Sequence, residues 1–201
     1  MQSCEHPIIK KLYSGIDYKE GVEVGPAVAV SAPGKLMLFG EHAVMYGKPC
    51  VVTAIDRNML VGAARTPDNS IQINAPDVSN NPYKFMKNGL SGNGHPEKFG
   101  YVISALRNFY KKFKDEKDVR NSGVVLQIES QFGDAVSMGT SASVTTGVVA
   151  ALRELYGNLL GSTKYMNLRQ TFELAFEIIS LAKETIFGRI IINLKFSSMA
   201  S

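Results

Sequence analysis

The stretch SAPGKLMLFGEHAVMYGKP, residues 31–49, interrupts an apolar ribbon with polar and glycine residues. Pro-Gly-Lys at 33–35 breaks a predicted strand and places a cation at the break. Gly-Glu-His at 40–42 breaks it again and presents a carboxylate beside an imidazole. These interruptions weaken a sheet through glycine entropy and charge desolvation. Such local conflicts concentrate at functional sites. A single Lys or His would more often be a surface residue, but these two interruptions, together with Tyr-Gly-Lys-Pro at 46–49, indicate a site.

Short apolar or alternating segments surround this stretch and are separated by Pro, Gly or polar breaks. This pattern predicts strands at 27–32, 35–39, 50–55, 59–64, 70–75 and 123–129. The segment 76–96, rich in Asn, Gly and Pro, is expected to be a long surface loop. Because most of the strands come early rather than alternating with helices, the order predicts an α+β fold with a mainly antiparallel or mixed sheet packed by helices.

Helical periodicity predicts three helices. The first covers 97–114, with an apolar stripe from Phe99 to Phe113, and the second covers about 140–156 and ends at Gly157. The third starts after Asn167, a good N-cap residue. Its expected core stripe is Leu168, Phe172, Ala175, Phe176, Ile179 and Ala182.

Composition and charge exclude several classes of protein. The 201 residues carry 22 basic and 18 acidic side chains, a net charge of +4, and the densest basic run, KKFKDEK at 111–117, mixes both signs. Nucleic-acid binding is therefore not favoured. Cys4 and Cys50 have no metal-ligand spacing, and no window resembles a signal peptide or a membrane span. We expect a cytoplasmic protein that binds neither nucleic acid nor a membrane.

A second stretch, VSMGTSASVTTGVVAAL at 136–152, has the local pattern of an anion site. The first N–H groups of a helix have no intrahelical partner, and small side chains at 139–143 allow a polyphosphate to approach them. A hydroxyl in the first turn can also bind Mg²⁺. The alternative is that Ser and Thr simply cap the helix. A Walker A motif is excluded, because neither Gly-Lys pair is followed by Ser or Thr.

The two stretches together resemble the GHMP kinases, and the first is most similar to the motif of the mevalonate kinases. The likeness runs from about Ala27 to Gly188. It implies an N-terminal arm at 1–26, a GHMP kinase N-terminal domain at 27–188 with the ribosomal protein S5 domain 2-like fold, and a divergent tail at 189–201. It further implies ATP-dependent phosphorylation of a small-molecule alcohol, mevalonate or a related compound, in isoprenoid biosynthesis.

The resemblance also implies roles for single residues. Lys35 would stabilise the transferred phosphoryl group, and Glu41 and His42 would lie at the alcohol-binding pocket. Mg²⁺ would be held by Ser141 and by Glu184, although a solvent-facing helix glutamate explains Glu184 equally well. The ATP phosphates would be bound by Ser137, Met138, Gly139, Thr140, Ser141 and Ala142. In this stretch Ser137, Met138, Thr140 and Ser143 replace the family's usual Gly, Leu, Ser and Ala.

The chain departs from the family at the general base. The family carries an Asp in a Ser-Gly-x-Asp segment after its metal-binding Glu, whereas this chain has no Asp beyond residue 134. We therefore expect little kinase turnover from this chain alone. The open alternatives are a non-catalytic nucleotide-binding or partner-binding module, an unfolded remnant, and an RNA-binding protein. A homodimer is a further open expectation.

Overall fold

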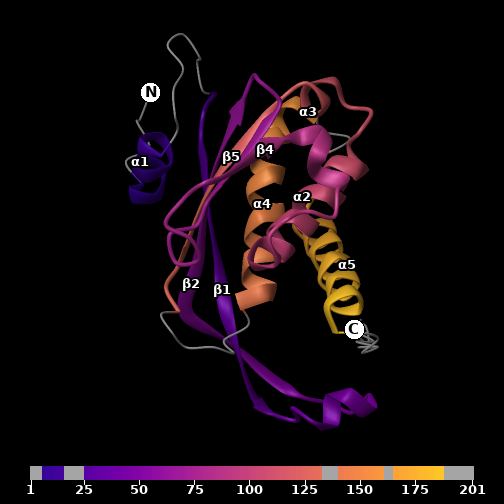
Figure 1. Ribbon diagram of the computed structural model, residues 1–201. Coiled ribbons are helices and arrows are strands. Elements are labelled where there is room, and N and C mark those ends of the chain that lie inside the picture. The colour runs from indigo at the N-terminus through magenta and orange to yellow at the C-terminus, as the bar shows by residue number, and fades with distance from the viewer. Residues whose placement is uncertain (1–5, 16–24, 133–139, 161–164, 188–201) are drawn as a thin grey trace.

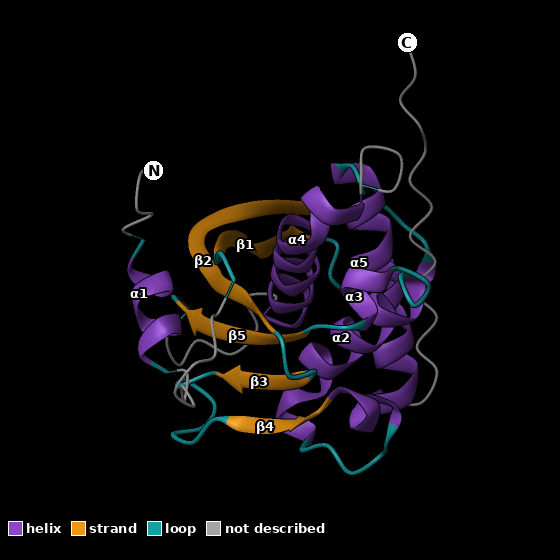
Figure 2. Cartoon of the chain, turned by 90° about the horizontal axis from the view of Figure 1, so that it is seen from above, coloured by secondary structure: helices purple, strands orange, loops and turns teal. Residues whose placement is uncertain are grey.

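The computed structural model describes residues 6–15, 25–132, 140–160 and 165–187. A five-stranded sheet lies at its centre, in the order β1-β2-β5-β3-β4 (Figure 2). Neighbouring strands are antiparallel except β3 and β5, which are parallel. The expected α+β fold with a mixed sheet is confirmed. The strands are β1 (Val28–Phe39), β2 (Val51–Thr66), β3 (Ser70–Asn74), β4 (Tyr83–Met86) and β5 (Gly123–Ser130).

Helices cover both faces of the sheet (Figure 1). Helix α1 (Pro7–Ser14) packs on one face and buries Ile8, Ile9 and Leu12, so the predicted N-terminal arm contains a docked helix. The other face is covered by α2 (Gly100–Lys112), α4 (Thr140–Leu160) and α5 (Leu168–Phe187). The short elements are α3 (Lys117–Arg120) and the 3₁₀ helices η1 (Ala43–Tyr46), η2 (Lys87–Ser91) and η3 (Glu97–Phe99). No described helix is both long and apolar enough to span a bilayer.

The hydrophobic core lies between the sheet and the α2–α4–α5 layer. The stripe expected on the first helix is buried throughout, from Phe99 to Phe113. Phe109 is fully buried and its ring centroid lies 5.8 Å from that of Tyr156 on α4. The two helices are therefore joined by aromatic packing, which stabilises the body of the protein.

Several sequence expectations on local structure are corrected. The strands expected separately at 27–32 and 35–39 form one strand, β1, and those expected at 50–55 and 59–64 form β2. Pro33 and Gly34 do not end β1, because a shift of register between them lets the pairing with β2 continue. The segment 76–96 is not only a loop, since it contains β4 and η2.

The two C-terminal helices also differ from expectation. Gly157 lies inside α4 rather than at its end, and Tyr165 packs so close to it that an added Cβ would lie 2.5 Å from the ring. Asn167 caps α5 as expected, since its Oδ1 accepts a hydrogen bond from the backbone N–H of Gln170 at 2.9 Å. The core stripe expected on α5 is confirmed only in part, because Ala175 is buried whereas Leu168 and Phe172 are exposed. The buried residues are Thr171, Leu174, Ala175 and Ile178.

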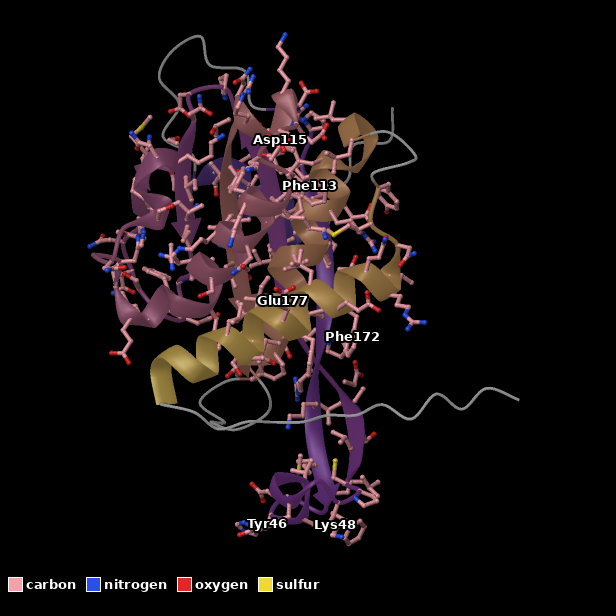
Figure 3. The ribbon with its side chains drawn as sticks, turned by 90° about the vertical axis from the view of Figure 1, so that its right-hand side faces the viewer. Tyr46, Lys48, Phe113, Asp115, Phe172 and Glu177 are labelled. Carbon is pink, nitrogen blue, oxygen red and sulfur yellow. The ribbon has the colours of Figure 1, made fainter. Side chains whose placement is uncertain are left out.

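Strands β1 and β2 continue together beyond the rest of the sheet. Residues 34–55, here called the hairpin extension, comprise the outer halves of both strands and η1 between them. Strand β5 pairs with β2 only from Met59 onward, so the outer part is a two-stranded ribbon. Figure 3 shows Tyr46 and Lys48 at its outer end, away from the body. The extension has exposed apolar side chains at Leu36, Leu38, Phe39, Tyr46, Val51 and Val52.

Candidate functional site

The first turn of α4 lies against β1 at the Pro-Gly-Lys motif. The hydroxyl of Ser143 donates a hydrogen bond to the carbonyl oxygen of Pro33 at 2.8 Å. Ser143 is buried and Thr140 is exposed, so one side of this turn faces the strand and the other faces solvent. The two sequence motifs, separated by about a hundred residues, are therefore adjacent in the fold.

Glycine at position 34 permits the close packing at this junction. A Cβ added to Gly34 would lie 2.4 Å from the ring of Phe132, which is far inside van der Waals contact. Phe132 follows β5 and is itself buried. The glycine of the Pro-Gly-Lys motif therefore allows β5, β1 and the head of α4 to converge on one edge of the sheet.

Lys35 is the residue of β1 that follows Gly34, and its backbone pairs with Ala54 of β2. Its side chain is exposed. Pro33 contacts α4, and Lys35 is two residues further along β1 than this contact. The helix macrodipole adds partial positive charge at the same place. The backbone of Lys35 thus lies near the head of α4, and a contact of its ammonium with an anion there stays a prediction.

Glu41 and His42 are not brought to the head of α4. They lie in the turn after β1, at the outer end of the hairpin extension, and both are exposed. At about 3.3 Å per residue, the strand from Gly34 to Phe39 alone spans about 17 Å. The structure therefore separates the predicted substrate-binding pair from the predicted phosphate-binding turn.

Of the predicted phosphate-binding residues, Thr140, Ser141 and Ala142 form the first turn of α4. Ser137, Met138 and Gly139 lie outside the described residues, as does the side chain of Glu184 on α5. Within the described part of the chain, no group of three or more His, Cys, Asp or Glu side chains is placed to hold a metal. The predicted magnesium ligands Ser141 and Glu184 therefore stay predictions.

A cavity of about 210 Å³ opens at the head of α4 and is lined by Thr140 and Ser141. Asp77, which follows β3, and Lys98, in η3, also line it, although the sequence analysis missed both. The Oδ2 atom of Asp77 accepts a hydrogen bond from the backbone N–H of Ser130 at 2.7 Å. The remaining lining includes the apolar side chains of Met59, Val78, Phe99, Val102, Ile128 and Val144.

The position of Asp77 follows from sheet topology. Strands β3 and β5 are parallel, so their carboxyl ends meet at the same edge, where α4 begins. An aspartate three residues after a buried strand is the signal that could have identified it. The arrangement combines the first turn of a helix, Lys98, the carboxylate of Asp77 and an apolar wall. It can bind an anionic group beside a flat apolar one.

Comparison with known proteins confirms the resemblance to the GHMP kinases. The model of the GHMP kinase N-terminal domain matches residues 100–180, and that of the galactokinase galactose-binding signature matches residues 17–65. The mevalonate kinase of Thermococcus onnurineus is 32% identical over 149 residues, which cover 73% of this chain and 45% of that protein. This chain belongs to the GHMP kinase family. The mevalonate kinase of Pyrococcus furiosus matches to the same extent.

Solved structures of GHMP kinases share the fold. The mevalonate kinase of Methanococcus jannaschii superposes with a TM-score of 0.65 at 24% identity, over 84% of this chain and 50% of that one. The galactokinase of Lactococcus lactis, solved with galactose, gives a TM-score of 0.65 at 16% identity, over 89% of this chain and 42% of that one. The chain thus spans about half the length of the GHMP kinases that it matches.

Proposed function

We propose that this chain binds ATP through its phosphates at the head of α4 and is the nucleotide-binding part of a mevalonate kinase-like phosphotransferase. The hydrogen bond from Ser143 to Pro33 carries the proposal, because it brings the small-residue turn to the strand that bears Lys35. The cavity beside Thr140 and Ser141 supports it by offering apolar space for a base next to the anion site. The identity with mevalonate kinases supports the choice of substrate.

The proposed chemistry is phosphoryl transfer to an alcohol. Such transfer depends on positioning and on neutralising phosphate charge, which free helix N–H groups and a lysine both provide. Mg²⁺ would be held between the phosphates and the oxygens of Ser141 and Glu184. Glu41 and His42 would contact the alcohol, and the separation described above means that only a displacement of the hairpin extension would bring them to a substrate at the phosphates.

The cavity also bears on how much activity the chain has alone. Its 210 Å³ is below the range of about 300–1,000 Å³ found for complete ligand pockets. We therefore propose that the chain binds nucleotide but transfers phosphate to mevalonate slowly by itself. A role in isoprenoid biosynthesis and a location in the cytoplasm belong to the same proposal.

Titration of a fluorescent ATP analogue into the 201-residue chain, with and without Mg²⁺, tests the proposal. Lys35→Met should weaken binding by about tenfold, the loss of roughly one charge-assisted contact. Lys48→Met is the matched control, since Lys48 is an exposed lysine of the same hairpin extension, at its outer end (Figure 3). Equal affinities for the two variants would contradict the proposed site.

Phosphorylation of mevalonate, followed in the same samples, separates the proposal from its alternative. Slow but ATP-dependent product formation that Lys35→Met abolishes would support a kinase-derived site. Nucleotide binding with no product at all would favour a non-catalytic nucleotide-binding module. Absence of nucleotide binding by the folded chain would exclude both.

A further inference from the structure

A second cavity, of about 630 Å³, lies between α2, α5 and the segment that joins η2 to η3. Its volume is within the range of about 300–1,000 Å³ typical of small-molecule sites. It is separate from the cavity at the head of α4. Lys98 and Phe99 line the smaller cavity, whereas Gly100 and Ile103 line the larger one. An inference from it therefore stands apart from the proposed ATP site.

The rim of this cavity is held in place by hydrogen bonds. The guanidinium of Arg107 donates from Nε to the carbonyl oxygen of Leu90 at 3.0 Å and from Nη2 to that of Gly92 at 3.1 Å. On the other side, the ring of His95 lies 3.1 Å from the carbonyl oxygen of Gly89 through Nε2. Because a carbonyl only accepts, Nε2 is the donor. The segment from η2 to η3 is thus tied to α2, and the cavity is formed without a ligand.

One wall of the cavity is polar. Ser104, Arg107 and Asn108 all line it, and their spacing of three and four residues places them on one side of α2. A guanidinium has five N–H donors, and the two contacts to the rim leave further donors for a ligand. The Asn108 amide already donates one hydrogen bond to the carbonyl oxygen of Ser104 at 2.9 Å, which leaves its second N–H for a ligand. A hydroxyl, an arginine and this amide on one helix side form a suitable site for a carboxylate or a phosphate.

The α5 side of the cavity is apolar. Ile178 of α5 is buried, as is Ile103 of α2, and Leu181 of α5, which is 45% exposed, adds apolar surface. A purely ionic ligand would leave this surface in contact with water. The pairing of the two walls favours a ligand with an anionic head and a compact hydrocarbon body.

Glu97 makes the cavity favour an anion with one negative charge over an anion with two. This exposed carboxylate lies in the lining of the same cavity as Arg107. Arg107 and Glu97 together are close to neutral, so a ligand with two negative charges would be repelled by Glu97 more than a ligand with one. We propose that the cavity between α2 and α5 binds a small monocarboxylate with a branched apolar body, its carboxylate on Arg107 and its body on Ile178 and Leu181.

Calorimetric titration of 4-methylpentanoate into the 201-residue chain tests this proposal. Binding is expected with a dissociation constant of about 1 mM, as suits so small a ligand. Leu181→Glu should weaken it by about tenfold, because a carboxylate then faces the apolar body. The same substitution at Leu168, an exposed leucine near the other end of α5 that does not line this cavity, is the matched control and should leave the affinity unchanged.

Variants of the polar wall and analogues of the ligand test the contact between Arg107 and the carboxylate. Arg107→Gln should abolish binding, but it also removes the rim contacts, so Ser104→Ala is included and should cost about two- to threefold through loss of one hydrogen bond. The neutral analogue 4-methylpentanamide and inorganic phosphate should both bind at least about tenfold more weakly than the carboxylate. Equal binding of the amide, tighter binding of phosphate, or equal affinities of the Leu181→Glu and Leu168→Glu variants would each overturn the proposal.

Discussion

Strands β1 and β2 each belong to two different regions of the molecule. In the body, from Val28 to Pro33 and from Asn58 to Thr66, they are covered by α4 on one face, and Val61 and Ala63 are fully buried. In the hairpin extension the same two strands continue to pair with each other, yet Phe39 is 73% exposed. Both regions are equally apolar in sequence. An apolar strand pattern therefore predicts the strand but not whether another layer covers it.

Truncation of one phenylalanine in each region should show the largest difference between them. Phe109→Ala removes a fully buried ring that packs against Tyr156 and Phe113. We expect the free energy of unfolding to fall by about 3–5 kcal/mol. Phe39→Ala, at an exposed position of the hairpin extension, should change it by no more than about 0.5 kcal/mol. Urea denaturation of both variants measures the two values, and equal losses would mean that the extension is packed in solution.

A substitution at the boundary between the two regions should cause the second-largest loss of stability. Gly34→Ala adds a Cβ that would overlap the ring of Phe132, so the ring or the strand must move. Such overpacking should lower the free energy of unfolding by about 1–3 kcal/mol. Gly94→Ala is the control, because no atom lies within 4 Å of a Cβ at that position. A Gly34→Ala variant as stable as Gly94→Ala would show that the junction is loosely packed.

The sequence predicted what depends on local patterns. The stripe on α2 and the cap at Asn167 were predicted correctly because periodicity and capping involve residues close in the chain. The unbroken β1 was missed, because whether Pro33 and Gly34 end a strand or form a bulge is decided by the partner strand. The burial of α5 was misjudged for a similar reason. Apolar residues such as Leu168 and Phe172 cover most of its surface, and tertiary contacts choose which side is buried.

In the candidate site, too, the motifs could be predicted from the sequence, but their arrangement in space could not. The turn at 140–142 and the strand at 33–35 were identified as motifs, but only the fold shows that they touch, through Ser143. Asp77 is marked in the sequence only as a carboxylate just after a buried strand, and its place beside α4 depends on the parallel pairing of β3 with β5. Glu41 and His42 were grouped with Lys35 because they are close in sequence. An extended strand carries them away from it.

The smallest expected difference between the body and the hairpin extension is in how a lysine of each region affects the pH dependence of stability. Lys87 belongs to the body, where its ammonium donates hydrogen bonds to the carbonyl oxygens of Val119 at 3.0 Å and Ser122 at 2.7 Å. Burial lowers its pKa to about 8, from an ordinary value of 10.5. Between these values the unfolded chain binds more protons than the folded one, so the free energy of unfolding should rise with pH through this window.

Comparison of Lys87→Met with Lys48→Met isolates this effect. Lys48 is exposed at the end of the hairpin extension, and its replacement should leave the slope of stability against pH unchanged. Lys87→Met should lower stability at neutral pH by removing the hydrogen bonds, and it should flatten the slope between about pH 8 and 10.5. Because Lys87 is partly solvated, we expect a slope change below about 0.5 kcal/mol per pH unit. Denaturant midpoints measured across this range provide the test, and a slope that Lys87→Met leaves intact would assign the pH dependence to another group of the body.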